Sequence, residues 1–179
     1  MNKASLIKSL LFLFFVIVIV LLLSGCGYSD HEPGSYDEEY QLLNEHIYQY
    51  MDRKADGAYS ATGYLIIVDR NTSSVAGYVR NPFGGYTRAW AQTAVIGKNL
   101  ELSNYLIQWR LESYQYRETT AYNSTWFGKY TFCNTEDDSD AFPGGVYLTQ
   151  ENAMWIFRNC QNETPVIVFE SEYNPEHMT

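Results

Sequence analysis

Residues 64–68 read Tyr64-Leu65-Ile66-Ile67-Val68, a continuous apolar run rich in β-branched side chains. A strand with one solvated face alternates apolar and polar residues, whereas a continuous apolar run is typical of a strand covered on both faces. The turn-forming residues Asn71-Thr72-Ser73-Ser74 follow, and Val75 to Arg80 returns as an apolar hairpin partner. The sequence therefore predicts a hairpin whose first strand is covered on both faces.

Four further strands are predicted along the chain. Pro82 and Gly84-Gly85 interrupt the sheet, and Gly97-Lys98-Asn99 forms a tight turn. For Leu100–Glu112 a helix is the alternative, but dense aromatic and β-branched residues favour a strand. The predicted strands are Thr87–Ile96, Leu100–Tyr116, about Ser124–Cys133, and Val166–Phe169.

A first helix is predicted from Ser35 to Asp56-Gly57. Ser35 and Glu38 form a capping box, and Arg53 and Lys54 suit the negative end of the helix dipole. The apolar residues recur at helical spacing: Tyr36, Tyr40, Leu43, Ile47 and Met51.

A second helix is predicted to begin at the N-cap Thr149 and to end at Glu163-Thr164-Pro165. Its apolar positions are Ala153, Ile156, Phe157 and Cys160. The order of elements therefore predicts an α+β domain. We expect a mostly antiparallel sheet of about six strands, one N-terminal helix, and a second helix before the last strand.

The first 26 residues have the pattern of a secretory signal peptide. Lys3 and Lys8 precede an apolar run from Leu10 to Leu23, and small residues follow in Leu23-Ser24-Gly25-Cys26. These four residues resemble the lipobox of bacterial lipoproteins. The resemblance implies that Cys26 receives a diacylglycerol thioether, that the peptide is cut before it, and that the new amine is acylated, for example with palmitate.

Two alternatives to lipidation stay open. An uncleaved membrane helix needs about 20 apolar residues, and Leu10–Leu23 is shorter unless Lys8 is buried. An ordinary signal peptide would not require a Cys at the cut. We therefore expect residues 1–25 to be a signal peptide, 26–34 the lipidated cysteine and tether, and 35–179 one globular domain.

By the same resemblance, we expect a cell-envelope protein held to the membrane by its lipid. Gly27 at the second mature position implies the outer membrane if the source is Gram-negative. Cleavage before Cys26 would remove Lys3 and Lys8 and no acidic residue, which leaves 10 basic against 21 acidic side chains. Such a surface repels phosphate backbones, so we expect no nucleic-acid partner. It favours a cationic partner, such as a basic protein. The alternative explanation is that the acidic surface only keeps the domain soluble.

Two cysteines remain in the mature chain, Cys133 and Cys160. Exported proteins meet oxidising conditions, so the pair predicts a disulfide. The chain has no Cys-x-x-Cys motif and no His near either thiol, which argues against zinc. We therefore expect no metal site.

Motifs of catalysis are missing from the sequence. There is no Gly-x-Ser-x-Gly, no His-Glu-x-x-His, no phosphate-binding loop and no dinucleotide fingerprint. His31 and His177 fall in predicted tails and His46 on the first helix. We therefore expect that the protein is not an enzyme and that it binds no cofactor. Paired carboxylates can still catalyse hydrolysis without a motif, and the candidates are Asp69, Glu112, Glu118 and Glu170.

Two features suggest a binding surface. Aromatic residues crowd the middle strands, Trp126 and Tyr130 among them, and such faces anchor proteins or stack on sugars when they are not core. An acidic loop holds Glu136, Asp137, Asp138 and Asp140, which is either a solvated loop or a weak calcium pattern. These six residues are the candidate partner site.

The sequence thus favours a lipid-anchored binding or accessory module, such as a component of a secretion, pilus or exclusion apparatus. One alternative is an acidic inhibitor or immunity protein against a basic envelope-targeting toxin or hydrolase. The other alternative is a small carboxylate-dependent hydrolase.

Overall fold

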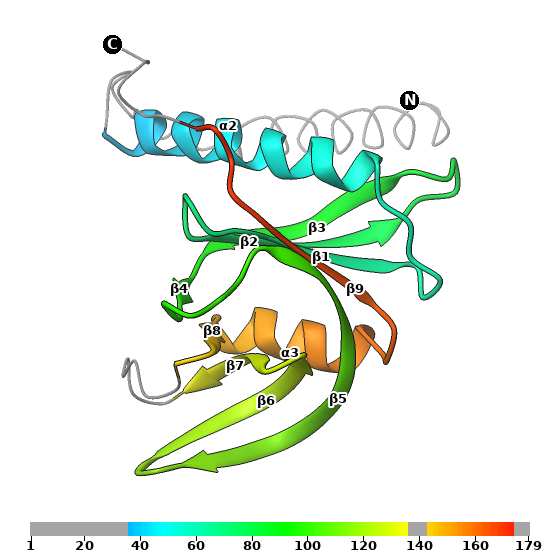
Figure 1. The fold of residues 1–179 in the computed structure, drawn as a ribbon. Helices are drawn as coiled ribbons and strands as arrows, with labels where there is room; N and C mark the ends of the chain where they lie inside the picture. Colours follow the sequence, from blue (N-terminus) through cyan, green and yellow to red (C-terminus); the bar gives the residue numbers. More distant parts are fainter. Residues whose placement is uncertain (1–35, 136–142, 174–179) are drawn as a thin grey trace, which may run out of the picture. The chain divides into compact units, whose positions relative to one another are not determined.

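The computed structural model describes residues 36–135 and 143–173. The relations between elements given below lie within the compact unit of residues 40–179. Figure 1 shows the elements, which in chain order are α2 (Tyr36–Asp56), β1 (Tyr64–Asp69), β2 (Ser74–Arg80), β3 (Tyr86–Thr93), β4 (Val95–Ile96), β5 (Ser103–Tyr116), β6 (Thr119–Phe127), β7 (Tyr130–Thr135), β8 (Gly145–Tyr147), α3 (Gln150–Asn159) and β9 (Pro165–Phe169).

The strands form one mixed sheet in the order β3-β2-β1-β9-β5-β6-β7-β8-β4. Most neighbours are antiparallel, but β1 pairs with β9 and β7 pairs with β8 in parallel. The α+β class is confirmed: in the described residues one helix precedes the strands and a second precedes the last strand. The predicted count of about six strands is wrong, because the described chain has nine.

The apolar run Tyr64–Val68 forms β1, and both of its faces are buried. Leu65 and Ile67 pack with Met51 of α2, in a cluster that also includes Ala55, Ala76 and Tyr78. Ile66 and Val68 pack on the other face in the main core with Ala153 and Ile156 of α3. Each buried Leu, Ile, Val or Met side chain of these clusters contributes about 1.5–3 kcal/mol to folding. The prediction of a strand covered on both faces is confirmed.

The second helix begins where the sequence predicts. The Thr149 hydroxyl accepts a hydrogen bond from the Asn152 N–H at 3.4 Å, which satisfies one free donor of the first turn of α3. The first helix carries Arg53 and Lys54 in its last turn, as expected. Its predicted N-cap, Ser35, lies outside the described residues.

Two predicted strands are each divided in the structure. The segment Thr87–Ile96 becomes β3 and β4, at opposite ends of the sheet order, because β2 begins at Ser74 and offers no partner beyond Thr93. The segment Ser124–Cys133 becomes parts of β6 and β7, joined by a two-residue turn in which Gly128 has φ +62°. The short β8 is not predicted at all. Neither described range contains a helix with the length and apolar character needed to cross a bilayer.

Candidate functional site

Three adjoining hollows follow the paired strands β4 and β8, and we call them together the β4–β8 groove. Their volumes are about 670, 620 and 780 Å³. The first and second share Lys98, Asn99 and Pro143. The second and third share residues 94–95 and Tyr147. The shared lining makes one extended groove with a cationic end and an uncharged end.

Two glycines bring the backbones of this groove close together. The Gly97 N–H donates to the Gly145 carbonyl at 2.8 Å. A Cβ on Gly97 would lie 2.4 Å from the Pro143 carbonyl oxygen, and a Cβ on Gly145 would lie 2.7 Å from the ring of Tyr147. Only glycine fits at these positions without a shift of the neighbouring atoms. Near these glycines the wall of the groove is therefore made of backbone and of the Tyr147 ring.

The cationic end is lined by Arg70, Lys98 and Lys129 together with one carboxylate, that of Glu101. This is a local excess of positive charge in a chain with a formal net charge of −9. Lys129 pairs with Glu101 at 2.7 Å, but the two side chains are 65% and 68% exposed, so solvent screens the pair. Lys98 is exposed and forms no ion pair with any described residue.

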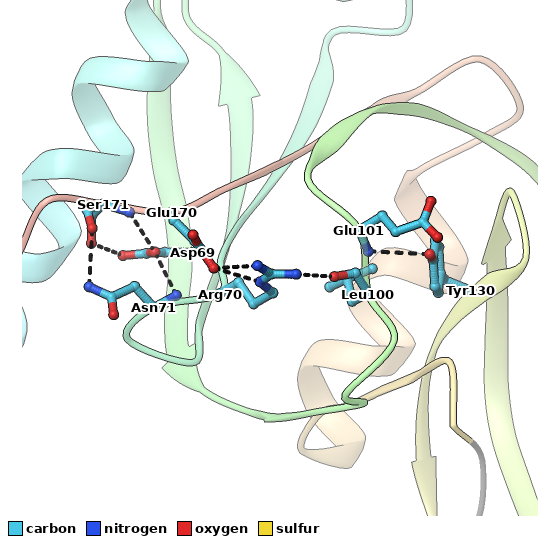
Figure 2. A network of polar contacts seen from close by, with 8 residues as sticks. All are labelled: Asp69, Arg70, Asn71, Leu100, Glu101, Tyr130, Glu170 and Ser171. Atoms are coloured by element: carbon cyan, nitrogen blue, oxygen red, sulfur yellow. Dashed lines mark hydrogen bonds and ion pairs between the residues drawn. The ribbon is translucent and has the colours of Figure 1, made fainter.

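Arg70 is held from two sides (Figure 2). Its guanidinium forms an ion pair with Glu170, and its Nη1 donates to the Leu100 carbonyl oxygen at 2.7 Å. The backbone N–H of Arg70 donates to Phe169 O at 2.9 Å. The side chain is thus fixed between the end of β9 and the loop that leads into β5.

The buried carboxylate of Asp69 organises the backbone beside Arg70 (Figure 2). It accepts a hydrogen bond from the Asn71 N–H at 3.1 Å. It accepts another from the Thr72 hydroxyl at 2.8 Å. It also accepts from the Ser171 N–H at 3.0 Å and the Ser171 hydroxyl at 2.5 Å. A buried carboxylate with four donors is a satisfied structural group. Asp69 therefore fixes the β1–β2 turn against the chain after β9.

The other candidate carboxylates do not join Asp69 in a catalytic pair. Glu170 is engaged with Arg70. Glu112 is exposed on β5, and Glu118 is exposed in the turn between β5 and β6. The structure therefore places the four candidates in different roles and does not bring them together around one ligand position.

The uncharged end of the groove is ordered around Gln92. Its Oε1 accepts from the Thr149 hydroxyl at 3.0 Å and from Asn152 Nδ2 at 2.5 Å. These bonds join β3 to the first turn of α3. Amide and hydroxyl groups line this end, and they present hydrogen-bonding groups without charge: Gln92, Thr93, Asn134, Thr135, Thr149 and Gln150.

Of the two aromatic candidates, Tyr130 belongs to the core. It is 1% exposed, its hydroxyl donates to Asn99 O at 2.8 Å, and it accepts from the Glu101 N–H at 3.2 Å. The prediction that Tyr130 contacts a partner is corrected, because its ring is buried in the core and its hydroxyl holds the loop at the cationic end. Figure 2 shows its bond with the Glu101 N–H. Trp126 is also buried, at 7% exposure. Arg70, Lys98 and Lys129 were not predicted as site residues from the sequence, since isolated cations carry no motif.

Cys133 and Cys160 are free thiols in the structure, so the expected disulfide is not formed. Both are buried, and burial raises the pKa of each thiol to about 12, with Arg110 acting weakly in the opposite direction at Cys160. A thiol is nucleophilic as the thiolate. Both groups are therefore neutral core side chains in this conformation.

The remaining candidate residues, Cys26, Glu136, Asp137, Asp138 and Asp140, lie outside the described residues. The acidic partner surface and the lipid site thus stay predictions. In the described part of the chain, no three His, Cys, Asp or Glu side chains gather closely enough to hold a metal ion.

No family model and no curated protein matches this sequence. Solved structures do share its fold. One is a protein from Clostridium acetobutylicum described as a fused Zn-dependent amidase/peptidase/peptidoglycan-binding domain-containing protein, with a TM-score of 0.56 and 14% identity over 68% of this chain and 59% of that one. Another is an L,D-transpeptidase from Stackebrandtia nassauensis, with a TM-score of 0.51 and 12% identity over 65% of this chain and 60% of that one.

The chain thus spans about three-fifths of the length of these two proteins, and the likeness is one of fold. It corrects the expectation that the chain is not an enzyme, because an L,D-transpeptidase is built on the same architecture. The missing motifs on which that expectation was based are therefore not an argument against catalysis.

Proposed function

We propose that the protein is a lipid-anchored module of the bacterial cell envelope that binds an anionic segment of peptidoglycan in the β4–β8 groove. The observation that carries this proposal is the gathering of Arg70, Lys98 and Lys129 at one end of a groove in an acidic chain. Charge of one sign in a hollow attracts and orients ligands of the opposite sign.

The shape of the groove suits an extended polymer. A single pocket for a small molecule has a volume of about 300–1,000 Å³, and here three hollows of 620–780 Å³ adjoin one another. Peptidoglycan consists of sugar chains joined by short peptides with free carboxylates. A peptide carboxylate would lie at the cationic end, while amide and hydroxyl groups of the ligand would meet the uncharged end.

Two further observations support a location at the cell envelope and peptidoglycan as the ligand. The Leu23–Cys26 segment resembles a lipobox, which would hold the domain at a membrane facing the wall. One solved protein with this fold is described as containing a peptidoglycan-binding domain. A basic protein partner is a separate proposal, which the acidic composition supports.

The test is co-sedimentation of the purified full-length chain with peptidoglycan sacculi at increasing salt. The wild-type chain is expected to bind at low salt and to be released as ionic strength rises. Lys98→Glu should weaken binding about tenfold, since a charge-assisted contact is worth about 1.5 kcal/mol. Lys54→Glu is the matched control, because it makes the same charge change at an exposed position on α2.

The absence of binding at low salt, or an equal loss in the two variants, would contradict the proposal. Release of soluble muropeptides during the incubation would show turnover of the wall. The binding role would then give way to an enzymatic one at the same substrate.

A further inference from the structure

The long strand β5 is paired on both sides along only part of its length. The antiparallel pairing with β9 runs from Ser103 opposite Val168 to Leu106 opposite Pro165. Ile107 closes this edge with two backbone hydrogen bonds, to Thr164 O at 2.9 Å and from Glu163 N–H at 2.8 Å. From residue 108 onward, no described strand pairs with β5 on the side away from β6. Figure 1 shows the β5–β6 hairpin extending beyond the end of β9.

Residues 108–113 form this open edge, and all six are exposed. Two of them are large and apolar, Trp109 at 42% and Leu111 at 40% exposure. An edge with unpaired backbone donors and acceptors is a template for another strand. The open edge is therefore a surface on which a strand can be added.

The sequence of the open edge is complementary to itself. Arg110 and Glu112 stand on either side of Leu111. If two copies pair in antiparallel fashion about a twofold axis at Leu111, Arg110 of each copy lies opposite Glu112 of the other. Opposite charges directly across a strand pair are stabilising, and like charges are destabilising. A twofold interface repeats each such contact.

We propose that the open edge of β5 pairs with the same edge of a second copy of this chain, antiparallel and centred on Leu111. The neighbouring symmetric registers, centred on Arg110 or on Glu112, would place like charges opposite each other. The register is therefore specified by charge. Nη1 of Arg110 donates to Phe157 O at 2.7 Å, which leaves further N–H groups of the guanidinium for the second copy.

Charged residues on an edge also serve to prevent pairing, and cross-linking distinguishes the two roles. Leu111→Cys in the full-length chain should give a covalent dimer with a short bifunctional thiol reagent. Directly opposite Cβ atoms in such a pair are about 5 Å apart. Leu106→Cys is the control, because it is 53% exposed on the same strand but lies where β9 is paired. Cys133 and Cys160 are buried, so they should stay unlabelled, and Cys26 is changed to Ser in every variant so that it cannot be cross-linked.

Charge reversal then tests the register. In the Leu111→Cys background, Arg110→Glu alone and Glu112→Arg alone should each lower the dimer yield at least fivefold. The combined exchange of Arg110→Glu and Glu112→Arg should restore it. The combined variant also lacks the bond from Arg110 to Phe157, so recovery cannot come from that contact. Equal cross-linking through Leu106→Cys, or no recovery in the combined variant, would overturn the proposal.

Discussion

The indole ring of Trp109 stacks on that of Trp126, with ring centroids 4.6 Å apart and ring planes at 11°. The two residues are opposite each other on β5 and β6, yet Trp126 is 7% exposed and Trp109 is 42% exposed. Tyr114 meets Trp126 edge-on at 5.3 Å. Trp126 is thus a core residue that Trp109 covers from the solvent side.

The two tryptophans should therefore differ in their contribution to stability. Trp126→Ala is expected to lower the free energy of unfolding by about 3–5 kcal/mol, because it leaves a cavity under the stack. Trp109→Ala should cost about 1–2 kcal/mol, for the lost stacking and the partly buried area. Urea denaturation followed by fluorescence measures both values, and Trp109→Phe is a control that keeps an aromatic ring. If Trp126→Ala and Trp109→Ala lowered the free energy of unfolding equally, Trp126 would not be more deeply buried than Trp109.

The buried thiols predict a loss of stability in alkali. Burial raises the pKa of Cys133 and Cys160 to about 12 from the ordinary 9.0. Above pH 9 the unfolded chain releases thiol protons that the folded chain retains, so the free energy of unfolding falls as pH rises. The expected loss between pH 9 and 10 is about 1 kcal/mol per thiol.

Urea denaturation at pH 8, 9 and 10 measures this dependence. The control is a variant with both thiols changed to Ala, in which the decline between pH 9 and 10 should be smaller by about 2 kcal/mol. Thiol labelling should also be slow in the native protein and complete in denaturant. Rapid native labelling of either thiol would contradict the burial that underlies the prediction.

A substitution at Gly97 tests the close approach inside the groove. The added Cβ of Gly97→Ala would meet the Pro143 carbonyl at 2.4 Å, which is backbone and cannot rotate away. We expect a loss of about 2 kcal/mol or more. Gly57→Ala is the matched control, because nothing lies within 4 Å of its added Cβ. Thermal unfolding of the two variants should separate them clearly, and equal melting temperatures would argue against the close packing of β4 on β8.

The parts of the fold that were predicted correctly are those with a local physical signature. Leu65 to Val68 are apolar at consecutive positions, and that pattern required two covered faces. Thr149 could be recognised as a cap because a hydroxyl before an apolar helix satisfies a free N–H. The parallel pairing of β1 with β9 joins residues about 100 positions apart, such as Val68 and Val168. No local pattern encodes that contact.

The candidate site was harder to predict than the fold. Tyr130 was expected at a binding surface, and it is core, because aromatic content does not distinguish a buried ring from an exposed one. Arg70 directly follows β1 and Lys98 lies between β4 and β5, 28 positions further along the chain. They line one hollow only in the folded sheet, and no local pattern predicts that. The contact between Gly97 and Gly145 could likewise not be predicted from the sequence. β8 has only three residues and follows a polar segment, so it has no recognisable strand pattern.

The position of β9 has a consequence for how the chain is made. This strand lies between β1 and β5, so among the described strands it alone joins the β1–β3 part of the sheet to the β4–β8 part. A ribosome completes it after every other strand, and until then both flanking strands have an unpaired edge. The sheet therefore cannot close during synthesis of residues 40–164, and the nascent polypeptide stays open until its last strand is released. Such a delay would suit the export that residues 1–26 predict, because a translocation channel must receive a chain unfolded.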